Sequence, residues 1–132
     1  MNKTEKPLVV SVPEPRTLDL IFTPEQRARL YNTCKIVETT PSEFRALPDK
    51  TLSGVKYIIG QPPISSGLLD KMKALRCVLN VESNLINNMP YDKLFERGIH
   101  VVTTGAVFAE PVAEMGLGLA LDLARGISNA NS

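Results

Sequence analysis

The 132-residue sequence has one histidine, two cysteines and no long apolar run, and these scarcities exclude several classes of protein. A membrane-spanning helix needs about 18 or more continuous apolar residues, and no stretch of the sequence is that long. The apolar run at residues 8–12 is too short for the core of a signal peptide, and Pro13 interrupts it. No spacing typical of metal ligands is present either. We therefore expect a cytoplasmic protein without a metal site.

The chain has no marked excess of positive or negative charge. The chain carries 15 basic and 14 acidic side chains, a net charge of +1, and no basic block that would favour nucleic-acid binding. Cys34 and Cys77 both lie in apolar runs. Because a secretion signal is missing, we expect buried, reduced thiols in preference to a disulfide.

Short runs rich in Val and Ile alternate with helical patterns along the chain. Five such runs, each bounded by turn residues, predict strands at 7–12, 34–40, 55–60, 75–81 and 99–104. Their nearly continuous apolar content is typical of a parallel sheet covered by helices on both faces. The alternation predicts an α/β, flavodoxin-like, doubly wound sheet of five parallel strands in the order 2-1-3-4-5.

The helices between these strands have recognisable start and stop signals. Thr23-Pro24-Glu25-Gln26 and Thr40-Pro41-Ser42-Glu43 each combine a Thr cap, a Pro at the first helical position and a Gln or Glu at the third. Ser65 and Ser66 are cap candidates for the next helix. A further helix is predicted over 88–97, ended by Gly98 in a left-handed conformation.

The predicted strand ends exclude the better-known ligand sites of this fold. Pro13-Glu14-Pro15 follows the first strand, where a flavodoxin has a phosphate loop, and Gly60-Gln61 follows the third, where a receiver domain has its aspartate. Gly116 and Gly118 lie in a helical pattern and do not form a phosphate turn. His100 lies within the last strand and is interpreted as structural, and neither cysteine has a histidine close to it in sequence. The residues alone predict a ligand-binding or interaction domain.

Residues 80–114 carry a more specific pattern. Several of these residues match, at the same spacing, a stretch that ends the substrate domain of D-isomer-specific 2-hydroxyacid dehydrogenases. The matching residues are Asn88, Glu96-Arg97-Gly98-Ile99, Thr104 and Val112-Ala113-Glu114. The chain resembles that N-terminal substrate domain. The resemblance implies hydride transfer between a small 2-hydroxy or 2-oxo acid and NAD or NADP in the complete enzyme.

The resemblance also implies what this sequence does not contain. The family's dinucleotide-binding domain follows the substrate domain and holds the catalytic arginine, acidic residue and histidine, none of which is present here. We therefore expect a truncated copy or a gene fragment that is inactive alone, has no catalytic residue and binds no cofactor by itself. The expected organisation is a substrate domain at 1–107, a long interdomain or dimerisation helix at 108–127 and a frayed tail at 128–132.

Four residues are candidates for substrate binding and one for cofactor binding. In the family, backbone amides after the fourth strand hold the substrate carboxylate; the matching positions are Asn84 and Leu85, beside Ser83. Glycine is absent at Ser83 and Leu85, so a plain polar turn is an equal alternative to an anion-binding nest. Gln61 would face the same cleft, although a solvated loop residue is the simpler interpretation. Thr104 matches a family threonine near the nicotinamide.

The last helix is apolar on more than one side. We expect one side to pack on the sheet of the same chain and another to form a homodimer seam, as the resemblance also implies, whereas an ordinary covering helix is the alternative. The seam combines large side chains with small ones that permit close helix approach. Its predicted residues are Phe108, Val112, Met115, Gly116, Leu119, Ala120 and Leu123. The competing hypothesis for the whole chain is a stand-alone, non-catalytic binding or dimerisation module.

Overall fold

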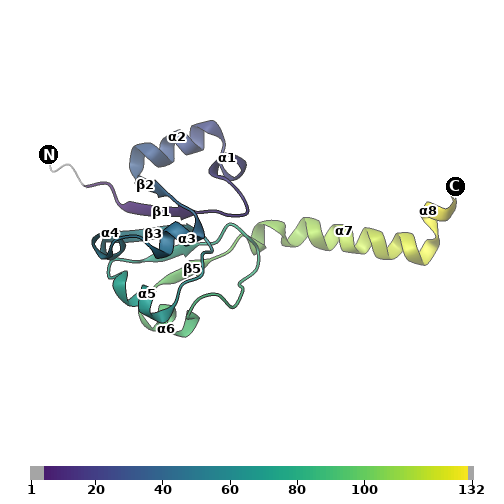
Figure 1. Cartoon of the computed structure of the whole chain (residues 1–132). Helices are drawn as coiled ribbons and strands as arrows, with labels where there is room; N and C mark the ends of the chain where they lie inside the picture. The colour runs from purple at the N-terminus through teal and green to yellow at the C-terminus, as the bar shows by residue number, and fades with distance from the viewer. Residues whose placement is uncertain (1–4, 131–132) are drawn as a thin grey trace.

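In the computed structural model, which describes residues 5–130, one five-stranded parallel sheet forms the centre of the molecule (Figure 1). The strand order β2-β1-β3-β4-β5 confirms the predicted order 2-1-3-4-5. The strands are β1 (Leu8–Val12), β2 (Lys35–Glu38), β3 (Val55–Gly60), β4 (Cys77–Leu79) and β5 (His100–Val102). The helices are α1 (Leu18–Ile21), α2 (Pro24–Thr33), α3 (Pro41–Arg45), α4 (Asp49–Gly54), α5 (Ser66–Lys71), α6 (Tyr91–Glu96), α7 (Gly105–Arg125) and α8 (Ile127–Ala130).

The predicted helix caps are present. Thr23 and Thr40 both form capping boxes, in which the Thr side chain accepts from the backbone N–H of Gln26 or Glu43 and that residue's side chain accepts from the Thr N–H. Ser65 accepts from the backbone of Leu68 at 3.1 Å. These local bonds satisfy backbone donors that a helix start otherwise leaves unpaired, which fixes where each helix begins.

The helix predicted over 88–97 is shorter than expected and spans Tyr91–Glu96. Two features place its start later in the chain than predicted. Pro90 disfavours helical geometry at the residue before it, and the side-chain amide of Asn88 donates to the backbone oxygen of Gln61 at 2.9 Å. Gly98 follows the helix with φ +67°, the left-handed conformation expected there.

One face of the sheet is fully covered. Helices α3, α4, α5 and α6 contribute Phe44, Leu52, Leu69 and Leu94 to a core around Val10, Ile58 and Val78. All seven of these side chains have essentially no exposed surface. This core holds the domain together and places the carboxyl ends of the strands at a common edge.

Helices lie on both faces, as expected, but the other face is covered only in part. Helices α1 and α2 pack on β1, β2 and the adjoining side of β3, where Val9 and Ile59 are buried. The register continues the row of Ile59 through Leu79 on β4 to Val102 on β5. Exposure rises along this row from 3% to 39% and 44%. The β4–β5 half of this face, called the open sheet face below, is therefore apolar and uncovered.

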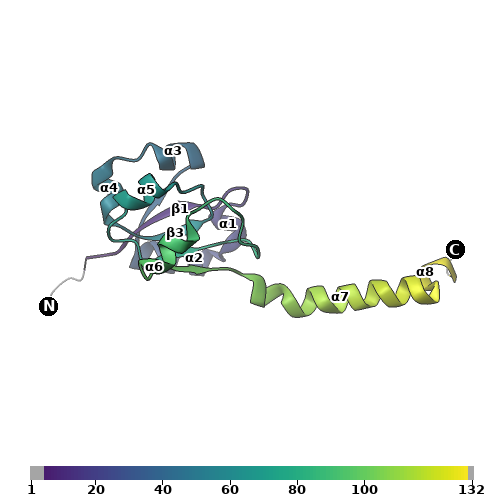
Figure 2. The ribbon, with the colours of Figure 1, turned by 90° about the horizontal axis from the view of Figure 1, so that it is seen from below.

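Helix α7 leaves the domain and runs away from it, as Figures 1 and 2 both show. It begins at Gly105, three residues before the predicted start, and none of its residues is buried. The expectation that one side packs on the sheet of the same chain is therefore wrong. Because the helix starts early, Pro111 lies in its second turn and not its first, and leaves the carbonyl of Val107 without its i+4 donor.

Beyond α7 the chain turns at Gly126, whose φ of +61° is left-handed, into the short helix α8. Asp122 fixes this corner, because its carboxylate accepts from the Ser128 N–H at 2.8 Å and from the Ser128 hydroxyl at 2.7 Å. The tail was expected to fray over 128–132, but it is helical up to Ala130. Residues 131–132 lie outside the described residues.

Cys34 and Cys77 are free thiols, as expected, but both are half-buried instead of fully buried. Partial burial raises the pKa of the Cys77 thiol. Cys77 pairs in register with His100 at the edge of the open sheet face, where His100 is exposed. The incomplete cover of this face explains why neither residue reaches the core.

Candidate functional site

A pocket of about 510 Å³ lies at the carboxyl ends of β4 and β5, where this class of sheet places its ligands. We call it the strand-end pocket. Helix α1 forms one wall, the segment after β4 forms the floor and the first two turns of α7 form the other wall. Its lining consists of Arg16, Leu20, Ile21, Val81, Glu82, Ser83, Thr104, Phe108 and Val112.

Ser83 and Thr104, two of the candidate binding residues, meet in this pocket. The Thr104 N–H donates to the carbonyl of Glu82 at 3.4 Å, which joins the two strand ends. A Cβ at Gly105 would lie 3.2 Å from the carbonyl oxygen of Ser83, so glycine allows this close approach. The Thr104 hydroxyl is buried without a hydrogen-bond partner, one of two such side-chain atoms in the described residues.

Arg16 and Glu82 form an ion pair at the edge of the pocket. Arg16 Nε lies 2.8 Å from Glu82 Oε1, and a second guanidinium nitrogen lies 3.4 Å from Oε2. The hydrogen bond to Glu82 raises the pKa of Arg16, so the guanidinium stays charged. Both side chains are substantially exposed, at 51% and 39%, so the pair positions a cation more than it stabilises the fold.

The loop after β4 is shaped by Asn80, which is only 4% exposed. Its amide nitrogen donates to the carbonyl of Asn84 at 2.8 Å, and its amide oxygen accepts from the Glu82 N–H at 2.9 Å. One buried side chain thus closes the backbone from 80 to 84 into a fixed turn. This turn sets the position of Ser83 in the pocket.

Gln61 belongs to this bracing network and does not line the strand-end pocket. Its amide is best satisfied with the nitrogen 3.2 Å from the carbonyl of Asn84 and the oxygen 3.1 Å from the Ile86 N–H. Tyr91 completes the network, since its hydroxyl donates to the carbonyl of Ile86 at 2.7 Å. The structure therefore brings Gln61 to the predicted loop, where it holds the backbone.

Asn84 and Leu85 lie on the exposed side of the same loop, and Leu85 is 49% exposed. Among the described residues no residue other than glycine has positive φ. Asn84 thus does not supply the left-handed conformation that could replace the missing glycine. A nest with a left-handed residue is therefore not formed at 83–85.

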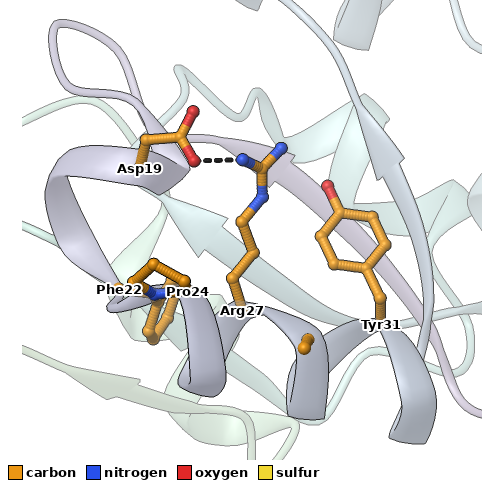
Figure 3. Close-up of a pocket in the computed structure, with 6 residues that line it drawn as sticks. Asp19, Phe22, Pro24, Arg27 and Tyr31 are labelled. Carbon is orange, nitrogen blue, oxygen red and sulfur yellow. Dashed lines mark hydrogen bonds and ion pairs between the residues drawn. The ribbon is translucent and has the colours of Figure 1, made fainter.

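A second hollow, of about 550 Å³, lies over α1 and α2 (Figure 3). Its polar groups are paired with each other or with β2: Arg27 binds Asp19 and lies 5.6 Å from the centre of the Tyr31 ring, and the Tyr31 hydroxyl donates to Glu38. This hollow is lined by residues of α1, α2 and their connection, and not by strand ends. We therefore place the candidate site at the strand-end pocket.

Sequence reasoning missed Arg16 and the two α1 residues that line the pocket, Leu20 and Ile21. The signal for Arg16 was available, because it follows the Pro13-Glu14-Pro15 segment at the end of the first strand. Within the described residues there is no group of three or more His, Cys, Asp or Glu side chains that could hold a metal ion. In the same part of the chain, no helix combines the length and the apolar character needed to span a membrane.

The fold and the pocket define the class as a flavodoxin-like α/β domain with a site at its strand ends. No family model and no curated protein matches the chain. Among solved structures, a phosphoglycerate oxidoreductase from Rhizobium etli matches at 62% sequence identity and a TM-score of 0.80, over 96% of this chain. The chain spans 39% of the length of that relative.

Two more distant structures share the fold. A protein from Pyrococcus horikoshii is 20% identical with a TM-score of 0.68, over 96% of this chain and 36% of its own. The D-mandelate dehydrogenase of Rhodotorula graminis is 18% identical with a TM-score of 0.64, over 89% of this chain and 36% of its own. The predicted resemblance is confirmed: the structural neighbours include dehydrogenases of the D-2-hydroxyacid family, and this chain is similar to only a part of each.

Proposed function

We propose that this chain is the substrate-side domain of an NAD(P)-dependent dehydrogenase acting on small D-2-hydroxy acids or the matching 2-oxo acids. The observation that supports this most is the 62% identity to the Rhizobium etli oxidoreductase over 96% of the chain. At that identity, the substrate-side residues of the relative are expected to have close counterparts here.

In this proposal the acid enters the strand-end pocket with its carboxylate toward Arg16 and Ser83. The guanidinium offers planar donors that suit a carboxylate or a phosphate, and Glu82 holds it in place. Val81 and Phe108 give the other side of the pocket an apolar surface. Thr104 offers a hydroxyl whose hydrogen bond is not yet used.

The residues present do not form a dinucleotide site by themselves. The pocket provides one cation, which is already paired, and no glycine-rich phosphate loop. The cofactor of the complete enzyme is therefore proposed to be held by a partner domain, and this chain alone is proposed to be inactive.

A reconstitution experiment tests the proposal. The chain is mixed with the remaining portion of the Rhizobium etli relative, and oxidation of NADH or NADPH is followed with a panel of 2-oxo acids. Turnover is expected only in the mixture, and Arg16→Gln is expected to raise KM more than it lowers kcat. Arg29→Gln, an exposed arginine of α2 outside the pocket, is the matched control.

Two outcomes would contradict the proposal. One is a stable complex of the two polypeptides without turnover on any acid of the panel. The other is micromolar binding of NADH by the isolated chain, measured by fluorescence titration, because it would place a cofactor site within these 132 residues.

One observation favours a second function, a homodimerisation module. Large apolar side chains of α7 are 50–84% exposed, among them Met115, Leu119 and Leu123. Burying such a side chain contributes about 1.5–3 kcal/mol. The sum over three of them is comparable to the roughly 5–15 kcal/mol net stability of a domain. A partner for this helix is therefore expected whether or not the chain contributes to catalysis.

A further inference from the structure

The amino ends of the strands form a basic edge of the sheet, which we call the amino edge. An exposed basic side chain lies at or beside the start of each of the first four strands: Lys6, Lys35, Lys56 and Arg76. Two backbone hydrogen bonds join neighbouring strand starts, from the Lys35 N–H to the Pro7 carbonyl and from the Arg76 N–H to the Lys56 carbonyl, both at 2.9 Å. In Figure 1 the chain enters β1 on the left and α7 leaves on the right, so this edge lies away from α7.

A hollow of about 260 Å³ lies within the amino edge, and we call it the amino-edge pocket. Three lysines surround it, one each from the starts of β1, β2 and β3. They face a single glutamate, so the pocket has an excess of two positive charges. The lining residues are Glu5, Lys6, Pro7, Leu8, Lys35, Gly54 and Lys56.

Local structure determines where two of these lysines lie. Lys6 Nζ donates to the carbonyl of Tyr31 at 3.1 Å, near the C-terminal end of α2, where the helix dipole favours a cation. Lys56 is the extra residue of a β-bulge, because the register between β1 and β3 shifts at this position. A bulge leaves its extra residue without a partner on the neighbouring strand and changes the direction of its side chain. Both lysines therefore line the same pocket although they come from different strands.

The lysines of the pocket are not neutralised by the protein. Within residues 5–130, Lys35 and Lys56 form no ion pair and no side-chain hydrogen bond. Glu5 lines the pocket but forms no ion pair with any of the three lysines. A group of cations without a counter-charge produces a positive potential that attracts anions. The pocket therefore calls for an anionic occupant.

The composition of the pocket decides among the anionic occupants. Lysine is depleted at protein–protein interfaces, which disfavours a partner chain or another domain. Nucleic acid needs a longer basic surface, and the net charge of the chain is only +1. A phosphate monoester carries a charge of about −1.5 to −2 at pH 7, which matches the excess charge of the pocket. The lysine ammonium is also a common point-charge partner of phosphate.

We propose that the amino-edge pocket binds the phosphate monoester group of a small molecule, through Lys6, Lys35 and Lys56. The site lies at the opposite end of the strands from the strand-end pocket, and it does not depend on the dehydrogenase assignment. A bound phosphate would join the starts of three strands, so its binding should also stabilise the fold.

A titration of the isotope-labelled 132-residue chain, followed by NMR at constant ionic strength, tests this site. The probes are inorganic phosphate and glycerol 3-phosphate, and both should shift the amides of Lys35 and Lys56 to saturation. Lys35→Gln and Lys56→Gln should each weaken binding about tenfold, because each removes one charge from the pocket. Lys50→Gln is the matched control, since Lys50 is an exposed lysine of α4 outside the pocket, and it should change binding by less than about twofold. Circular dichroism checks that each variant is folded.

Four results would overturn the proposal. The first is the absence of saturable shifts, and the second is binding of inorganic phosphate but not of the ester. The third is binding that is lost in Arg16→Gln and kept in both lysine variants, which would place the anion in the strand-end pocket. The fourth is loss of the shifts when the unlabelled remaining portion of the Rhizobium etli relative is added, which would show that a domain contact covers the amino edge.

Discussion

Replacing Asn80 by alanine should loosen the loop that carries the candidate site while leaving the rest of the domain folded. Asn80 is 4% exposed and makes two hydrogen bonds, to the Asn84 carbonyl and from the Glu82 N–H. Each such bond contributes about 0.5–1.5 kcal/mol net, so losing both should reduce the free energy of unfolding by about 1–3 kcal/mol. The upper end of this range applies if the orphaned backbone groups stay shielded from water.

Urea unfolding measures that loss, and hydrogen exchange of the Glu82 amide localises it. The amide is expected to lose protection in Asn80→Ala, whereas amides of β1 and β3 should change only by the global loss of stability. Asn87→Ala is the matched control, because Asn87 is exposed in the same loop and its side chain makes no hydrogen bond to the described residues. Unchanged stability together with unchanged protection of Glu82 would refute the view that Asn80 shapes this loop.

Three further predictions concern the scaffold. Gly60→Ala should reduce the free energy of unfolding by more than about 3 kcal/mol or prevent folding, which thermal unfolding can measure. The reason is that φ is +113° at Gly60 and the added Cβ would lie 1.9 Å from the carbonyl oxygen of Val12. Gly67→Ala, in α5 with nothing within 4 Å of the added Cβ, should instead stabilise by up to about 1 kcal/mol in the same assay. The hydrogen bond from the Thr40 N–H lowers the pKa of Glu43 in the folded state below its usual 4.5. The Glu43 carboxylate therefore stabilises the fold at pH values above 4.5, and this stabilisation is lost as the pH falls through the lower pKa of the folded state. Glu43→Gln should therefore flatten the acid side of the stability profile, and an unchanged acid profile would contradict the assignment.

The elements that local chemistry determines were predictable from the sequence. The strand over 55–60 and both Thr capping boxes lie where the pattern placed them, because turn residues and cap side chains act within a few positions. The strand order was predictable from the alternation of strands and helices together with the flavodoxin-like order common in doubly wound sheets. Helix 91–96 was less predictable, since its start depends on a bond between Asn88 and the distant Gln61.

The site was predictable only in its location. The rule that ligands lie beyond parallel strand ends brought Ser83 and Thr104 to one pocket, but it could not show that Gln61 would be used to brace the loop. Arg16 also follows a strand end and could have been included by the same rule, but its ion pair could not be predicted because Glu82 is distant in sequence. The direction of α7 was also beyond the sequence, because an apolar stripe reports that a helix needs a neighbour and not which one.

Helix α7 is attached to the molecule through its least supported strand. β5 is an edge strand with a three-residue ladder to β4 alone, and Thr103 and Thr104 connect it directly to the helix. Any pull transmitted along α7 is therefore borne first by those few hydrogen bonds, which would break in succession from the edge inward. A tether fixed to the C-terminal end should peel the sheet at low force, while the same tether on β1, in the middle of the sheet, should meet two ladders loaded at once.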